Sequence, residues 1–150
     1  MVVAPWWRPP ATLIAASREE AVEQHARLAQ AGTNLAYTDG SGYKGGVGAA
    51  AVLGNQSINR LLGKEANYTV YCAEVGIEMA LASALSLGVR ELTIMTDNQA
   101  AVRACAEPRP QSGQFVIKRI IHLLNRLDAR GQTVRIHWLP GHEGVPGNER

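Results

Sequence analysis

Two kinds of apolar spacing alternate along the chain and together predict an α/β fold. Short apolar runs bounded by turn-forming residues predict strands, which we place at residues 34–38, 47–53, 57–63, 91–96 and 133–139. Apolar residues at every third or fourth position predict helices, which cover residues 70–87, 98–107 and 112–130. The order is strand, strand, strand, helix, strand, helix, helix, strand. It is typical of an α/β domain with a mixed sheet, in which the first three strands form an antiparallel meander.

The first 32 residues have a weaker pattern than the rest of the chain. The segment Ser17–Glu20 has the spacing of a capping box, and the helix that it begins is predicted to run to about Gln30. The apolar face of this helix is thin, so we interpret residues 1–32 as a flanking segment with a linker helix outside the central fold. Residues 33–150 are then the folded domain, and His25 is interpreted as a surface histidine.

Composition and charge restrict the class of protein. With 150 residues, of which 46% are hydrophobic, the chain is long and apolar enough to form one globular domain with a core. The net charge of +2 is too small to indicate a nucleic-acid partner by itself. Cys72 and Cys105 lack the spacing of metal ligands and are interpreted as reduced thiols of an intracellular protein, nuclear or cytoplasmic. No apolar run is judged long enough to cross a bilayer, so no membrane partner is expected.

Three acidic residues stand where the predicted elements would bring them together. Asp39 and Asp97 each follow a predicted strand, and Glu74 lies beside the apolar face of the helix between those strands. Structural alternatives exist, because Asp beside Gly is typical of a turn and Asp before a helix is typical of an N-cap. Glu74 is different, since a buried carboxylate needs a partner for its charge.

A shared position for these acids would favour metal binding. If the two strands are parallel neighbours, both aspartates lie at the carboxyl edge of the sheet, where open α/β sheets place their sites. Three carboxylates that close repel one another unless cations hold them, and hard oxygen ligands favour Mg²⁺ or Mn²⁺. Two such ions suit the hydrolysis of a phosphodiester.

Basic residues recur on the polar side of the predicted helix over 112–130. They are spaced three or four residues apart and comprise Arg119, His122, Arg126 and Arg130. Such a stripe suits the phosphates of a nucleic acid, and a merely solvated helix face is the alternative.

Four motifs follow one another along these elements. They are Thr38-Asp39-Gly40-Ser41, Ala73-Glu74, Thr96-Asp97-Asn98, and Trp138-Leu139-Pro140-Gly141-His142-Glu143-Gly144 through Gly147-Asn148-Glu149. In this order they resemble type 1 ribonuclease H, in the form found in retrotransposons, over roughly residues 34–150. The Trp-Trp-Arg-Pro-Pro segment and the helix after it resemble the flank between reverse transcriptase and ribonuclease H in such polyproteins.

The resemblance implies a ribonuclease-H-like fold, a mixed five-stranded sheet flanked by helices. It implies hydrolysis of the RNA strand of RNA·DNA hybrids with two Mg²⁺ or Mn²⁺ ions. By this resemblance Asp39, Glu74 and Asp97 are metal ligands, and His142 assists proton transfer and product release. The substrate contacts it implies are Gly40, Ser41, Gly42, Thr69, Asn98, Arg119 and Arg126. The expected partners are the hybrid and a reverse transcriptase domain of the same polyprotein.

The sequence departs from the family pattern at its end. The family has a fourth acid, an aspartate shortly after the Asn-Glu-Arg motif, and then a helix that packs on the sheet, whereas this sequence ends at Arg150. We therefore expect impaired catalysis, and self-association through the sheet face that this helix would cover. The alternative function is a non-catalytic module that binds hybrid or has a structural role in a retroelement polyprotein. A nucleotide-binding protein with residues 42–48 as a phosphate cradle is disfavoured, because those glycines lie between two strands.

Overall fold

The computed structural model describes residues 7, 9–39, 42–43, 46–53, 56–63, 69–108 and 115–141, but not the side chains of Asp39, of strand residues 42–63 or of Thr69. The helices are α1 (Arg18–Gln30), α2 (Thr69–Leu87), α3 (Gln99–Ala106) and α4 (Phe115–Ala129). The strands are β1 (Ala11–Leu13), β2 (Leu35–Asp39), β3 (Gly42–Tyr43), β4 (Gly46–Leu53), β5 (Gln56–Gly63), β6 (Glu91–Thr96) and β7 (Thr133–Trp138).

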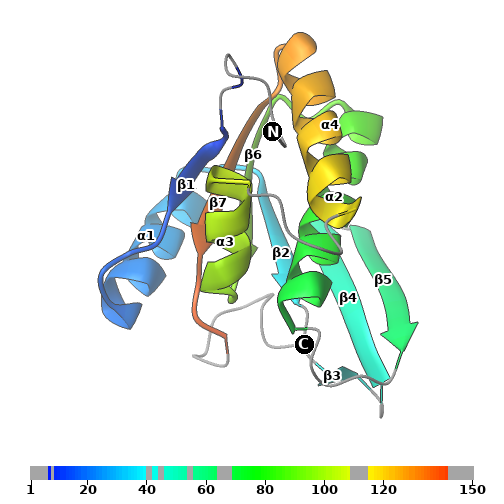
Figure 1. Ribbon diagram of the computed structural model, residues 1–150. Coiled ribbons are helices and arrows are strands. Elements are labelled where there is room, and N and C mark those ends of the chain that lie inside the picture. Colours follow the sequence, from blue (N-terminus) through cyan, green and yellow to red (C-terminus); the bar gives the residue numbers. More distant parts are fainter. Residues whose placement is uncertain are drawn as a thin grey trace.

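The described strands form one mixed sheet (Figure 1). Their order is β1-β7-β6-β2-β4-β3, and β5 also pairs with β4. β1, β7, β6 and β2 are parallel neighbours, whereas β4 is antiparallel to both β2 and β5. The five predicted strands are all present, and their predicted meander and the parallel pairing of β2 with β6 are confirmed. Two short strands that the pattern does not predict, β1 and β3, enlarge the sheet to seven strands in the described part of the chain.

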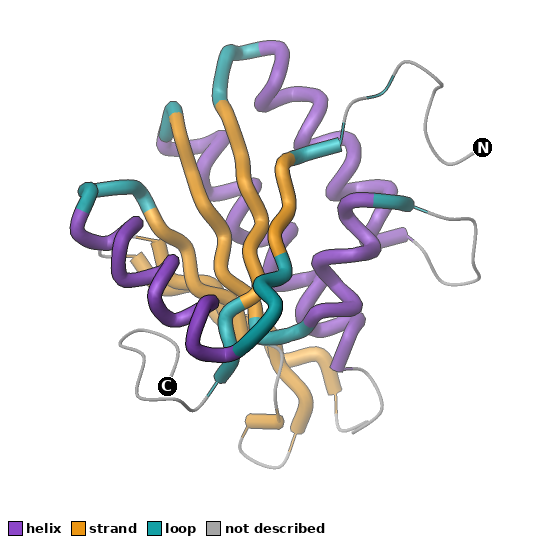
Figure 2. Tube along the Cα trace, turned by 90° about the vertical axis from the view of Figure 1, so that its left-hand side faces the viewer, coloured by secondary structure: helices purple, strands orange, loops and turns teal. Residues whose placement is uncertain are grey.

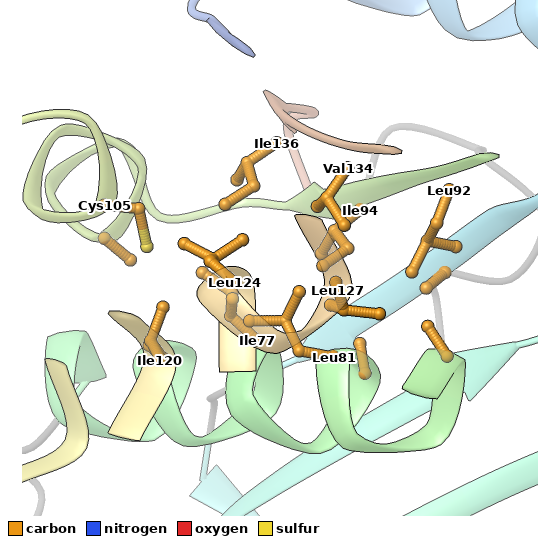
Figure 3. Packing of buried hydrophobic residues seen from close by; sticks show 14 of the residues in the cluster. Ile77, Leu81, Leu92, Ile94, Cys105, Ile120, Leu124, Leu127, Val134 and Ile136 are labelled. Atoms are coloured by element: carbon orange, nitrogen blue, oxygen red, sulfur yellow. The ribbon is translucent and has the colours of Figure 1, made fainter. Parts of the chain in front are cut away.

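The main core lies between the sheet and the layer of α2, α3 and α4. Ile77 and Leu81 of α2 are fully buried in it, together with Ile94 of β6, Ile120 of α4 and Ile136 of β7 (Figure 3). Removing this apolar surface from water is the principal stabilising term of such a fold. The three-and-four spacing of α2 and α4 in the sequence is therefore the spacing of the side chains that face the sheet.

α1 covers the opposite face of the sheet, so that the sheet lies between two helical layers (Figure 2). Val22 and Leu28 of α1 pack with Met95 and Leu139, and the preceding strand β1 pairs with β7. The interpretation of residues 1–32 as lying outside the central fold is therefore wrong for β1 and α1. A three-residue strand and a helix with a thin apolar face give too little periodicity to reveal their packing. α1 thus covers part of this face of the sheet, and the expected self-association stays a prediction.

His25 joins α1 to β2 and is buried, so its interpretation as a surface histidine is wrong. Its side chain is 7% exposed, and its Nε2 shares a hydrogen bond of 2.5 Å with the hydroxyl of Tyr37. The two rings meet edge to face. Burial lowers the pKa of His25 and raises the pKa of Tyr37, so both side chains are neutral at pH 7.

Trp7 docks on the protein itself. Its indole N–H donates a hydrogen bond of 3.1 Å to Oδ1 of Asn125, and its ring packs against the main core. Trp6 lies outside the described residues. Cys72 and Cys105 are both buried and free, as expected for reduced thiols.

α2 has the length and composition of a membrane-spanning helix, so the expectation that no apolar run is long enough is wrong on that criterion. Residues Val70–Leu87 have a mean hydropathy of 1.4 over 18 residues, and half of this stretch is buried inside the protein. A core helix that packs on two sides needs the same composition. The position of α2 between the sheet and α4 accounts for its apolar character.

Candidate active site at the carboxyl edge of the sheet

Asp39 and Asp97 leave two neighbouring parallel strands at the same edge of the sheet. The last register pair of β2 and β6 is Thr38 with Thr96, and the two aspartates are the next residue on each strand. Neighbouring strands lie about 4.8 Å apart, so the backbones of the two acids emerge side by side. The Thr38 hydroxyl donates a buried hydrogen bond of 3.2 Å to the carbonyl of Met95, which ties the strand ends together. The side chain of Asp39 lies outside the described part of the structure.

Glu74 approaches this edge from α2, whose first turns lie near the end of β2 (Figure 1). Burial raises the pKa of Glu74 from 4.5 to about 7. Its charge also contributes to the raised pKa of Cys105, about 12, whose main cause is burial on α3. Among the described residues, no side chain pairs or hydrogen-bonds with the Glu74 carboxylate. Glu74 is thus a partly buried acid with no cation beside it among the described side chains, as expected of a residue that needs an external partner.

Asp97 is not the N-cap of α3, because the next residue has that role. The Asn98 side chain accepts a hydrogen bond of 2.9 Å from the backbone N–H of Ala101, and the Asn98 N–H donates to the Thr96 hydroxyl (3.2 Å). The alternative interpretation, in which Asp97 serves as the N-cap of this helix, is therefore excluded. The same observation commits Oδ1 of Asn98, an expected substrate contact, to the helix cap.

The loop after β7 returns to the end of β6. The backbone N–H of Leu139 donates a hydrogen bond of 2.8 Å to the carbonyl of Thr96, and Leu139 and Pro140 are buried. The next residue, Gly141, then lies against the side chain of Asp97. The strand pairing thus carries the start of the histidine-bearing loop to one of the acids, whereas His142 itself lies outside the described residues.

The donor chemistry of this edge fits a hard divalent cation. Two aspartates and one partly buried glutamate carry the carboxylate oxygens that such a cation prefers, and a cation would offset the cost of ionising Glu74. Among the described side chains, no group of three His, Cys, Asp or Glu residues is arranged to hold a metal, a set that leaves out Asp39 and His142. Gly40 and Ser41 lie outside the described residues, and Gly42 and Thr69 are placed only by their backbone, in β3 and at the start of α2.

Replacing Glu74 by glutamine is expected to stabilise the metal-free protein at pH 8. The pKa of Glu74 is raised on folding, so the unfolded chain ionises from pH 4.5 upwards while the folded chain ionises near pH 7. Wild-type stability therefore falls as the pH rises through that window, and the neutral amide avoids the loss. We expect a gain on the order of 1–2 kcal/mol at pH 8, discounted for partial solvent screening, and no gain at pH 4. Urea unfolding in EDTA at both pH values measures it.

The matched control is Glu78→Gln, one turn further along the same helix. Glu78 forms an ion pair with Arg119, so the same chemical change should destabilise the protein at pH 8. A Glu74→Gln variant that is no more stable than wild type at pH 8 would show that Glu74 carries no stored desolvation cost.

The basic stripe on α4 is exposed, but one of its members is already paired. Nε and Nη2 of Arg119 donate hydrogen bonds of 2.6 and 3.1 Å to the two oxygens of Glu78, whose side chain is only 15% exposed. Glu78 therefore links α2 to α4. Arg126 and His122 are exposed, and neither forms a hydrogen bond or ion pair with the described residues.

A separate cavity of about 550 Å³ lies at the opposite edge of the sheet. It is bounded by the N-terminal segment near Trp7, the last turn of α4 and the start of β7. Gln132 lines it and donates to the carbonyls of Ala84 and Val89, while its buried Oε1 has no partner among the described residues. The cavity is remote from the three acids, so it belongs to a different part of the fold.

The fold and the acids place the chain among α/β domains with a site at the carboxyl edge of an open sheet. The RNase H family model matches residues 32–150, which is most of the chain. The chain belongs to the RNase H family, and its sheet of four parallel strands flanked by helices agrees with that fold. The predicted family and fold class are confirmed, and the family makes the chain a nuclease of the hydrolase class.

Proposed function

We propose that the protein is a metal-dependent endonuclease that hydrolyses the RNA strand of RNA·DNA hybrids. The observation that carries this proposal is the register that brings the backbones of Asp39 and Asp97 side by side at the carboxyl edge, with the partly buried Glu74 on the helix α2 that packs against β2 and β6. The family match over residues 32–150 supports the same activity. The motif resemblance adds a retrotransposon origin and a neighbouring reverse transcriptase domain, which belong to the same proposal.

Asp39, Glu74 and Asp97 would hold two Mg²⁺ or Mn²⁺ ions. When bound, such ions supply an activated water and stabilise the leaving oxygen of the cleaved phosphodiester. The task of the protein is to hold the three carboxylates on rigid elements, and the ends of β2 and β6 and the second turn of α2 provide that rigidity. His142 would take part in proton transfer, and it follows Gly141 in the sequence, which lies against the side chain of Asp97.

The substrate would lie across the glycine turn after β2 and along the exposed side of α4. Gly40, Ser41 and Gly42 would contact the RNA backbone, where the 2′-hydroxyl distinguishes RNA from DNA. Thr69 would contact a phosphate of the DNA strand. Contacts of this kind bind the backbone without sequence preference.

Arg126→Ala is expected to weaken hybrid binding without changing stability. Arg126 is exposed and forms no ion pair with the described residues, so its charge is available to a phosphate. The variant should bind hybrids of any sequence a few-fold more weakly. The slope of log K against log salt concentration (the salt slope) should decrease in magnitude by about 1. Fluorescence anisotropy in EDTA, over a series of salt concentrations, measures both without cleavage.

Arg119→Ala is the comparison, because this guanidinium is held by Glu78. Its removal should lower stability by about 1 kcal/mol and change the salt slope less than Arg126→Ala does. Equal affinity and an equal salt slope for wild type and Arg126→Ala would show that α4 does not contact the hybrid.

The proposed activity is tested by incubating the protein with a hybrid labelled on its RNA strand in Mg²⁺, in Mn²⁺ or in EDTA. The proposal predicts cleavage with either cation and none in EDTA. Binding of the hybrid without cleavage under any condition would instead support the non-catalytic module.

A further inference from the structure

Gly141 leaves no room for a side chain, and the group that occupies the space is the carboxylate of Asp97. A Cβ built on Gly141 would lie 2.9 Å from Oδ2 of Asp97, 3.5 Å from its Cβ and 3.6 Å from its Cγ. Real Cβ atoms essentially never make contacts below 3.0 Å, so a side chain at this position requires one of the two residues to move.

The backbone on both sides of this contact is held in place. Asp97 follows β6 directly, and Leu139 is bonded to Thr96 through the 2.8 Å hydrogen bond and is fully buried. Pro140, between Leu139 and Gly141, is also buried. An added Cβ would therefore press on the Asp97 carboxylate, the far end of a flexible side chain, and turn it about its own side-chain bonds.

We propose that Gly141 is a positioning residue that sets the direction of the Asp97 carboxylate toward the metal ions. This inference rests on the proposed function above, in which Asp97 is a metal ligand. The bare glycine backbone forms one wall beside Oδ2 of Asp97. Metal affinity depends on the direction of each ligand, and outer groups that orient ligands are worth about 10–100-fold in affinity.

The test is a Mn²⁺ titration of the full chain, followed by calorimetry in the absence of substrate. Gly141→Ala is expected to weaken Mn²⁺ binding about tenfold or more relative to wild type. In an Asp97→Asn background the same change should have little further effect, because the ligand that it acts on is already lost. Equal affinity for wild type and Gly141→Ala would overturn the inference. Absence of Mn²⁺ binding by the wild type would overturn the proposed function as well.

Gly131→Ala is the matched control, at the other end of the same strand. Gly131 has a φ of +74° and nothing within 4 Å of the position of a Cβ. Alanine there is strained but touches no ligand, so it should lower the unfolding midpoint and leave Mn²⁺ affinity unchanged. A purely structural effect of Gly141→Ala would instead resemble this control.

A measurement on the wild type keeps the inference testable if Gly141→Ala does not fold. In the ¹⁵N-labelled protein, Mg²⁺ addition should shift the amide resonances of Gly141 and Asp97 together and leave that of Gly131 in place. A Gly141 resonance that does not move while that of Asp97 does would contradict a role for Gly141 at the metal site.

Discussion

Asp97→Asn should reduce hybrid cleavage by about 10²–10⁴-fold while leaving the fold intact. The backbone of Asp97 lies beside that of Asp39 at the carboxyl edge. The Asp97 carboxylate does not cap α3, because Asn98 has that role. Loss of a metal ligand removes several kcal/mol of charge stabilisation in the transition state, at about 1.4 kcal/mol per tenfold in rate. The rate should be measured with the RNA strand labelled, at saturating hybrid and over a range of Mg²⁺ concentrations.

The control for Asp97→Asn is Asn98→Asp, at the next position. Aspartate is as good an N-cap as asparagine, so this variant should keep helix α3 and the fold. If Asp97→Asn retains activity within a few-fold of wild type, Asp97 is not a metal ligand in the reaction.

Leu81→Ala should lower the free energy of unfolding by about 3–5 kcal/mol. Leu81 is fully buried between α2, the sheet and α4, so the change removes apolar contact and leaves a cavity (Figure 3). This is a large part of the total stability of an ordinary domain. Urea unfolding followed by circular dichroism measures the loss.

Leu87→Ala on the same helix is the matched comparison, since Leu87 is 48% exposed. The same chemical change there should cost less than about 1 kcal/mol. Similar losses for the two variants would mean that α2 does not pack against the sheet and α4 as described.

The parts of the fold that the sequence predicts are those with a strong local pattern. α2 and α4 are apolar at every third or fourth residue, and both form where expected. Ser17 caps α1 through a hydrogen bond to the N–H of Glu20, which is the bond that the capping-box spacing predicts. The parallel pairing of β2 with β6 follows from the helix between them, because a crossover of this length joins parallel strands.

The parts that the sequence does not predict depend on partners far along the chain. His25 is buried because its ring hydrogen-bonds to Tyr37. Glu78 is mostly buried because Arg119, 41 residues later, forms an ion pair with it. The periodicity around each residue contains no sign of its partner. β1 is only three residues long and has no period of its own, so only its pairing with β7 makes it a strand.

Some features of the candidate site could likewise be predicted from the sequence, and others could not. The strand-end positions of Asp39 and Asp97 and the inner position of Glu74 could be predicted, because they follow from the order of elements and from helical spacing. The use of Asn98 rather than Asp97 as the N-cap could not be predicted, since both residue types are good caps. The contact of Gly141 with Asp97 could not be predicted either, because it depends on distances of less than 4 Å between segments far apart in the sequence.

Strand-selective hydrolysis is tested most directly by a cleavage assay with a hybrid whose RNA and DNA strands carry different labels. The same reaction is run on duplex DNA and duplex RNA, with Mg²⁺ and with Asp97→Asn beside the wild type. The predicted result is cleavage of the RNA strand of the hybrid alone, lost in the variant. Cleavage of the DNA strand, or cleavage that survives Asp97→Asn, would contradict it, as would an intact hybrid in the presence of folded, metal-loaded protein.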